Sequence, residues 1–99
     1  MKLRELAHSR SGDKGNISNI SVIAFRDEDY PLLLEKVTVH RVKAHFGDQV
    51  KGEVIRYELP EICALNFVLH GALAGGVTRS LALDMHGKSL SSALLDMEL

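Results

Sequence analysis

The sequence predicts an α+β fold: a two-layer sandwich in which helices pack on one face of a mainly antiparallel sheet. Runs of β-branched and alternating apolar residues at 17–25, 53–59 and 62–73 are typical of strands. After residues 30 and 89, apolar residues instead recur at three- and four-residue intervals, as in helices. No repeat, low-complexity tract or linker divides the chain, so we expect one domain spanning residues 1–99.

Composition excludes several classes of protein. The 99 residues are 45% hydrophobic and 25% charged, as in a globular domain with one core. The net charge is −1, lysines and arginines are scattered and aromatic residues make up 5%, so we expect no nucleic-acid partner. No stretch approaches the roughly 20 apolar residues of a membrane helix, and no signal peptide is visible. With Cys63 as its only cysteine, predicted to be a small core residue, the chain fits a reducing, cytoplasmic setting.

The first third of the chain predicts two strands around a polar loop. Leu3–His8 fits a short edge strand whose charged residues discourage edge-to-edge pairing. Arg10–Asn16 has no apolar side chain and is predicted to be a loop. Ile17–Phe25 is apolar on both faces, as expected of an inner strand. One face holds Ile20, Val22 and Ala24, and the other holds Ser21, Ile23 and Phe25.

Two consecutive helices are predicted next. The acids at 27–29 and Pro31 suit a helix start, with a carboxylate as its cap. The apolar stripe of this helix consists of Leu33, Leu34 and Val37. A β-branched run then predicts a break, with Thr38 as N-cap of a second helix, Val39–Phe46, that Gly47 closes. Val39, Val42 and Phe46 are expected to face the sheet.

The remaining elements are a hairpin, a short strand and a helix. Glu53–Leu59 alternates and ends at Pro60. Ile62–Leu73 fits either a helix or a strand; we predict a strand, because Gly71 weakens a helix and the turn at Pro60 favours a hairpin. A glycine turn, a strand at Arg79–Asp84 and a closing helix from Ser89 to about Met97 follow. The stripe of that helix is Leu90, Ala93, Leu94 and Met97.

The polar segment Arg10–Asn16 is a candidate anion-binding loop. Its glycines give access to positive φ, so that successive amide N–H groups can turn to one side, and its cations add charge. The alternative is a well-made turn between two strands. The candidate ligand-binding residues here are Arg10, Ser11, Gly12, Asp13, Lys14, Gly15 and Asn16.

A second candidate site is a polar face of the strand pair. Asn66 and His70 alternate onto the face opposite Leu65 and Phe67, and we expect Arg56 and Glu58 to share that face. Such a group could bind or protonate a carbonyl substrate. The alternative is a solvated face with cross-strand charge pairs.

The sequence gives little support for metal binding, nucleophilic catalysis or nucleotide hydrolysis. His40 and His45 do not match a known ligand pair, so we expect no metal site. No nucleophile–base–acid set can be read from the sequence, and residues 12–15 lack the spacing of a P-loop. We expect no cofactor.

Several segments together resemble the AtuA-like ferredoxin-fold domain. They are His8–Ile20, Arg56–Pro60, Ala64–Leu73, Thr78–Leu81 and Leu94–Met97, and the resemblance extends over nearly all 99 residues. The ferredoxin-like label fits loosely, because two strands are predicted before the first helix.

The resemblance implies a setting more than a reaction. Such a domain is usually the C-terminal part of large bacterial proteins of acyclic terpene utilisation, which are tied to acyl-CoA catabolism, and it also occurs as a separate small chain. It implies an accessory or binding module that works with a large AtuA-like chain and holds a CoA-type anionic ligand, with Arg79 as a further ligand-binding candidate. The alternative is a small separate enzyme acting by general acid–base chemistry. The apolar content of the strands also predicts a homo-oligomer joined through the open sheet face.

Overall fold

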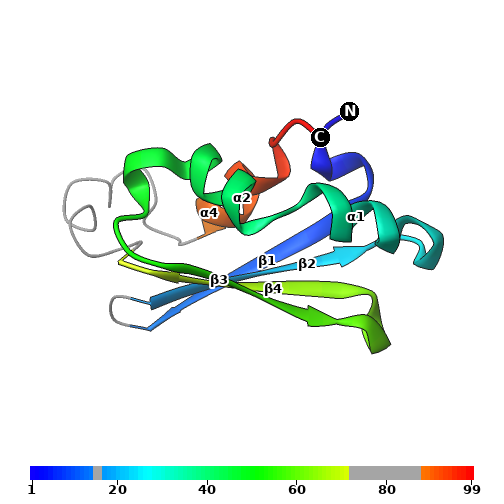
Figure 1. Ribbon diagram of the computed structural model, residues 1–99, viewed down its shortest axis with the longest axis horizontal. Helices are drawn as coiled ribbons and strands as arrows, with labels where there is room; N and C mark the ends of the chain where they lie inside the picture. The colour runs from blue at the N-terminus through cyan, green and yellow to red at the C-terminus, as the bar shows by residue number, and fades with distance from the viewer. Residues whose placement is uncertain (15–16, 72–87) are drawn as a thin grey trace.

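The computed structural model of the protein describes residues 1–14, 17–71 and 88–99. Within these ranges the sheet has four strands in the order β1-β2-β4-β3, and all neighbours are antiparallel. The strands are β1 (Ala7–Lys14), β2 (Ile17–Ala24), β3 (Val54–Leu59) and β4 (Ala64–His70). The helices α1 (Tyr30–Lys36), α2 (Val39–Phe46) and α4 (Lys88–Leu95) lie on one side of the sheet (Figure 1). This arrangement confirms the predicted α+β sandwich with its antiparallel sheet.

The first strand differs from the prediction. Leu3–Glu5 forms a 3-10 helix, and the strand starts at Ala7 instead of ending near His8. It continues through Arg10–Lys14, which was predicted to be a loop, and its last residue pairs with Ile17. The apolar strand β2 offers a continuous ladder to polar residues whose side chains need no burial, so the backbone pairs despite the polar composition. Gly15 and Asn16 lie outside the described residues.

The strands predicted within residues 17–25, 53–59 and 62–73 are confirmed as β2, β3 and β4. β2 lies between β1 and β4, as expected of an inner strand, and its Ile20 and Val22 are fully buried. The ambiguous segment after Ile62 is a strand, β4, and forms an antiparallel hairpin with β3. A 3-10 turn at Pro60–Ile62 connects the two strands, and Cys63 closes it in the left-handed region with φ 53°. The strand predicted at Arg79–Asp84 lies outside the described residues.

The two consecutive helices also follow their local sequence signals. Pro31 lies in the first turn of α1, but the side chain of Asp29 at the N-cap makes no capping hydrogen bond and instead lies 3.5 Å from Arg26. At α2, the Thr38 hydroxyl accepts a hydrogen bond from the Arg41 amide at 3.2 Å. Gly47 closes that helix at φ 58°, a conformation that glycine adopts without strain.

The chain ends lie side by side above the helix layer (Figure 1). The Leu3 amide donates to the Met97 carbonyl at 2.9 Å, and the Leu99 amide donates to the Met1 carbonyl at 2.8 Å. Lys2 and Glu98 form an antiparallel bridge between these bonds. The first and last residues of the chain are therefore held to each other.

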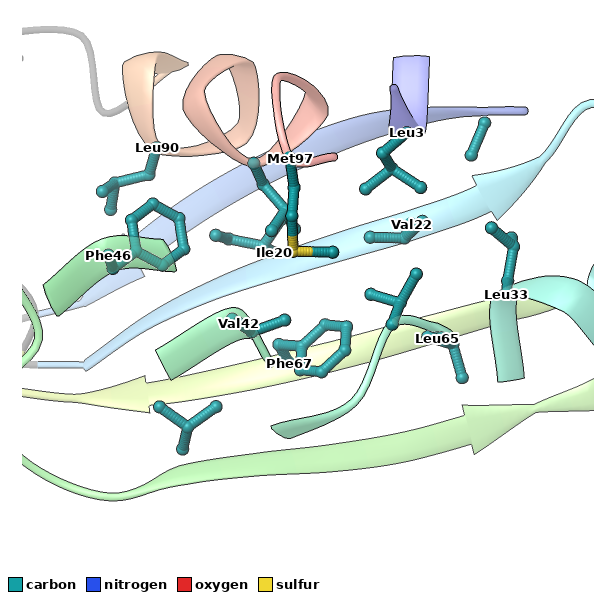
Figure 2. Packing of buried hydrophobic residues seen from close by; sticks show 14 of the residues in the cluster. Leu3, Ile20, Val22, Leu33, Val42, Phe46, Leu65, Phe67, Leu90 and Met97 are labelled. Carbon is teal, nitrogen blue, oxygen red and sulfur yellow. The ribbon is translucent and has the colours of Figure 1, made fainter. Parts of the chain in front are cut away.

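The core fills the space between the helices and one face of the sheet (Figure 2). Phe67 of β4 is the largest fully buried side chain. All the predicted helical stripes contribute to this core. Fully or almost fully buried helix and C-terminal residues are Leu33, Val37, Val42, Phe46, Leu90, Leu94 and Met97, with Leu34, Val39 and Ala93 partly buried against them.

Candidate functional site

The open face is the side of the sheet opposite the helices. Residues alternate between the two faces of a strand, so the burial of Ser18, Ile20 and Val22 toward the helices directs the intervening residues of β2 to the open face. Of these, Ile17 and Asn19 are exposed. The other three strands follow the same alternation in the registers of the sheet.

Cross-strand pairing arranges the open face in rows. One row runs across all four strands and consists of Arg10, Ser21, Asn66 and Tyr57. The next row consists of Gly12, Asn19, Val68 and Ile55, and on the other side lies the row of His8, Ile23, Ala64 and Leu59. The open face therefore combines polar groups at its centre with apolar side chains around them.

Large apolar side chains on this face remain in contact with water. Tyr57 is 51% exposed, Leu59 40% and Ile17 40%. Phe25, which follows β2, is 58% exposed and stacks on the His8 ring with the ring centroids 5.6 Å apart. A sheet face with this much accessible apolar surface is typical of an interaction surface.

Arg10 of β1 is a charged residue on the open face. The register places Glu58 of β3 on the helix side instead. Within the described part of the chain the Arg10 guanidinium has no ion pair or hydrogen bond, and the residue is exposed. Among the described residues, the open face thus offers a cation without a counter-charge.

The predicted polar cluster of Asn66, His70, Arg56 and Glu58 is wrong. Arg56 pairs with Phe67 and Glu58 with Leu65, so both face the helices, while Asn66 and His70 face the other way. Strand alternation separates residues into two sets but does not tell which set is buried. The apolar set of β3, which includes Tyr57 and Leu59, was the natural choice for the core, and the structure exposes it instead.

Arg56 has a structural role on the helix side. Its Nη1 atom donates to the carbonyls of Leu34 and Val37, both at 2.9 Å, and its Nη2 atom donates to Glu58 Oε2 at 2.8 Å. These carbonyls belong to the last turn of α1 and its C-cap, where a helix has no internal donors left. The guanidinium therefore fastens the end of α1 to the sheet.

The segment Arg10–Lys14 does not form the predicted concave set of amides. As a strand it directs Arg10 and Gly12 to the open face and Ser11 to the helix side. Gly12 is not in the positive-φ region, and its carbonyl accepts a hydrogen bond from the Ser18 hydroxyl at 3.0 Å. The candidates Gly15, Asn16 and Arg79 lie outside the described residues.

A hollow lies between α2 and the C-terminal residues. It is an open groove of about 410 Å³ lined by His40, Arg41, Ala44, His45, Met97 and Glu98. Two of its polar side chains have backbone partners: Arg41 donates to the carbonyls of Lys36 and Glu98, and His45 Nε2 lies 2.6 Å from the Ala93 carbonyl. In the described residues no group of three or more His, Cys, Asp or Glu side chains is arranged to hold a metal ion.

Cys63 lies on the helix side of the β3–β4 turn and is half-buried against the core. Its Sγ atom is 3.4 Å from Asp27 Oδ1. Partial burial raises the pKa of the thiol, and the carboxylate of Asp27 raises this pKa further. The side chain is thus a packed thiol rather than an activated nucleophile.

Sequence reasoning missed the part of the site that depends on register. Tyr57, Ser21 and Asn19 were not candidates, although they lie in the same rows as Arg10 and Asn66. Only the pairing of β1 with β2 reveals these neighbours, and reading Arg10–Lys14 as a loop removed that pairing.

The fold is a small α+β domain with one face of its sheet left open. The family model described as the AtuA ferredoxin-like domain matches residues 1–99, so the chain belongs to the AtuA ferredoxin-like domain family. No match is found among curated proteins or among solved structures. In the described ranges no helix is both long and apolar enough to cross a membrane.

Proposed function

We propose that this chain is an accessory binding module that joins an assembly with a large AtuA-like chain in the catabolism of acyl-CoA or related carboxylic acids. The observation that carries this proposal is the open face, which exposes Tyr57, Leu59 and Ile17 opposite a fully formed core. Apolar surface removed from water stabilises a complex by about 25 cal/mol per Å² before the costs of association. A face of this composition gains free energy when another surface covers it.

The cationic edge of the open face supports a role in anion recognition. Arg10 and Lys14 both belong to β1, where Arg10 pairs with Ser21 and Lys14, the last residue of the strand, pairs with Ile17. An anionic group, such as the phosphates of a CoA thioester or a carboxylate, is the expected contact of a cation without a counter-charge.

The alternative of a separate acid–base enzyme needs an acid and a base that converge on one substrate. The register separates the two candidates for these roles, because His70 shares the open face with Ile17 whereas Asp13 pairs with the helix-facing Ser18. This separation favours the binding module.

Coexpression tests the module role. The chain, carrying an affinity tag, is coexpressed with a large AtuA-like chain that lacks its own domain of this kind, and the purified material is separated by size exclusion. We expect the two chains to coelute in a fixed ratio. If the large chain elutes alone and its turnover of acyl-CoA thioesters is the same with and without the small chain, the proposal fails.

Calorimetric titration tests the anion contact. Coenzyme A thioesters and inorganic phosphate are titrated into the module, alone and with the large chain. Lys14→Ala is expected to weaken binding about tenfold, since a charge-assisted contact contributes roughly 1.5–3 kcal/mol, and the difference should shrink at high salt. The matched control is Lys43→Ala on α2, on the opposite side of the molecule. If the parent and Lys14→Ala bind these anions with equal affinity, Lys14 does not contact the anion and this part of the proposal is refuted.

A further inference from the structure

The strand order of the sheet points to the molecule that covers the open face. We propose that it is a second copy of this chain, related by a twofold axis that runs parallel to the strands between β2 and β4. This inference rests on the proposed function, in which the open face is an assembly surface, and it names the occupant of that face. In this proposal a dimer of the module, rather than a single copy, binds the large chain.

The symmetry follows from the order β1-β2-β4-β3, with two inner and two edge strands. A twofold axis along the strands places β1 of one copy over β3 of the other, and β2 over β4. Each cross-strand row then lies over the same row of the second copy. In the central row, Arg10 lies over Tyr57 and Ser21 lies over Asn66.

These pairs are complementary in chemistry. A guanidinium stacks favourably on a phenol ring, so Tyr57 gives Arg10, which has no ion pair among the described residues, a partner that needs no carboxylate. The Ser21 hydroxyl and the Asn66 amide can exchange hydrogen bonds as they are covered. Because Arg10 and Tyr57 belong to the edge strands β1 and β3, their pair lies at the rim, and the free N–H groups of the guanidinium remain open to an anion.

The pairing is also complementary in size. In one flanking row Gly12, which has no side chain, lies over Ile55 of the second copy. Two sheets pack face to face by interdigitating large and small side chains, and this row supplies such a pair.

Charge distinguishes this axis from the other possible one. A twofold axis perpendicular to the strands would place β1 over β1, and with the axis at the central row Arg10 would meet its own copy. The open face has no carboxylate at its described strand positions to compensate for this repulsion. The axis along the strands instead places the cationic strand over β3, whose open-face residues are Ile55, Tyr57 and Leu59.

The size of the face predicts a weak dimer. Four strands about 4.8 Å apart and about seven residues long have a footprint of roughly 450 Å². Side-chain relief increases the accessible area, but it stays near or below the roughly 800 Å² per partner of a standard interface. We therefore expect dissociation in the micromolar range, with monomers at nanomolar concentration.

Crosslinking between differently labelled copies tests the axis. Aligned sheets cross at about 30°, so residues next to the axis shift least from their rows. Ser21→Cys and Asn66→Cys are made separately in a Cys63→Ser background, because both positions are neighbours within one copy. A short bis-maleimide spans the roughly 10 Å between packed sheets, which a disulfide cannot bridge. We expect crosslinked heterodimers when the two variants are mixed, and none when Ser92→Cys, on the exposed side of α4, replaces Asn66→Cys.

A charge exchange provides the second measurement. In sedimentation equilibrium at 1 to several hundred micromolar, Tyr57→Arg should weaken the dimer at least tenfold, because it opposes Arg10 with a like charge. Gln49→Arg, which adds the same charge at an exposed helix-side turn, should leave the dimer unchanged. The double variant Arg10→Glu with Tyr57→Arg should restore it. Circular dichroism melts confirm that each variant is folded.

The outcomes separate this inference from the proposed function. A folded parent that stays monomeric throughout the concentration series overturns the second copy. The proposed axis is also refuted if Arg10→Cys of one copy crosslinks to Arg10→Cys of the other while Ser21→Cys and Asn66→Cys do not crosslink. If the parent is monomeric and coelutes with the large chain but Tyr57→Arg does not, the open face binds that chain directly. In that case only the proposal of a second copy is refuted. A dimer that binds no large chain supports the second copy and removes the proposed function.

Discussion

Arg56 and Phe67 occupy paired positions of β3 and β4, so a guanidinium shares the helix-facing side of the sheet with Phe67. Phe67 is the largest fully buried side chain among the described residues (Figure 2). A charged residue is found there because its guanidinium donates hydrogen bonds to the backbone carbonyls of Leu34 and Val37. The contact between helix and sheet at this point thus depends on hydrogen bonds as well as on apolar packing.

Replacing Arg56 is expected to destabilise the fold. Arg56→Ala leaves the carbonyls of Leu34 and Val37 without this donor, and an unsatisfied, partly buried acceptor costs about 1–3 kcal/mol. Arg56→Lys should recover only part of the loss, because an ammonium lacks the planar fork that reaches both carbonyls. Urea denaturation gives the free energy of unfolding, with the exposed Lys43→Ala as control. A loss no larger than that of Lys43→Ala would contradict the structural role.

Gly52 should tolerate no side chain, whereas Gly12 should. A Cβ atom on Gly52 would lie 2.6 Å from the His70 carbonyl oxygen, where the Gly52 amide also donates its hydrogen bond. A Cβ atom on Gly12 would meet only Asn19, at an ordinary 3.7 Å. Gly52→Ala is therefore expected to cost about 1–3 kcal/mol, as overpacking does. Gly12→Ala should be within about 0.5 kcal/mol of the parent. Thermal denaturation of both variants compares the sites, and equal melting temperatures would refute the close approach.

The N-cap of α2 offers a conservative test of local structure. Thr38→Ala removes the hydroxyl that accepts from the Arg41 amide and should lower the free energy of unfolding by about 1 kcal/mol. Thr38→Ser keeps the acceptor and should recover most of that loss. Chemical denaturation of the three proteins measures the difference. If both variants lose the same stability, the methyl group of Thr38 matters and the cap does not.

Cys63 should react slowly with alkylating reagents. Its raised pKa leaves less thiolate at pH 8 than a free cysteine has, so the native chain should react with iodoacetamide several-fold more slowly than the urea-unfolded chain. The rate should rise as pH increases toward the raised pKa. Asp27→Asn removes the negative charge near Sγ, lowers the pKa and should increase the rate at pH 8. Mass spectrometry of timed samples over pH 7–10 measures these rates, and an unchanged rate in Asp27→Asn would exclude the carboxylate as a cause.

Elements set by local chemistry were predictable from the sequence. Thr38 and Gly47 mark the start and end of α2 because a side-chain oxygen and a residue without Cβ each solve a local backbone problem. The apolar alternation of Ile17–Phe25 likewise identified an inner strand before any partner was known.

Features that depend on pairing could not be predicted in the same way. The polar composition of Arg10–Lys14 carries no sign of the ladder that β2 provides. The side of β3 that faces the helices is decided by Val54, which is buried, and by the hydrogen bonds of Arg56, not by the more apolar set that includes Tyr57. For this reason the prediction that Arg56 and Glu58 share a face with Asn66 and His70 was wrong.

The Leu99 amide donates a hydrogen bond to the Met1 carbonyl. The order in which the strands and helices follow one another along the chain could therefore be changed while their positions in space stay the same. Because the two ends are already neighbours, a short glycine linker could join them, and the chain could be opened at another exposed point without moving any packed element. The turn at Pro60–Ile62, between β3 and β4, is such a point. A circular permutant opened there would begin with β4 and end with β3, yet would present the same open face.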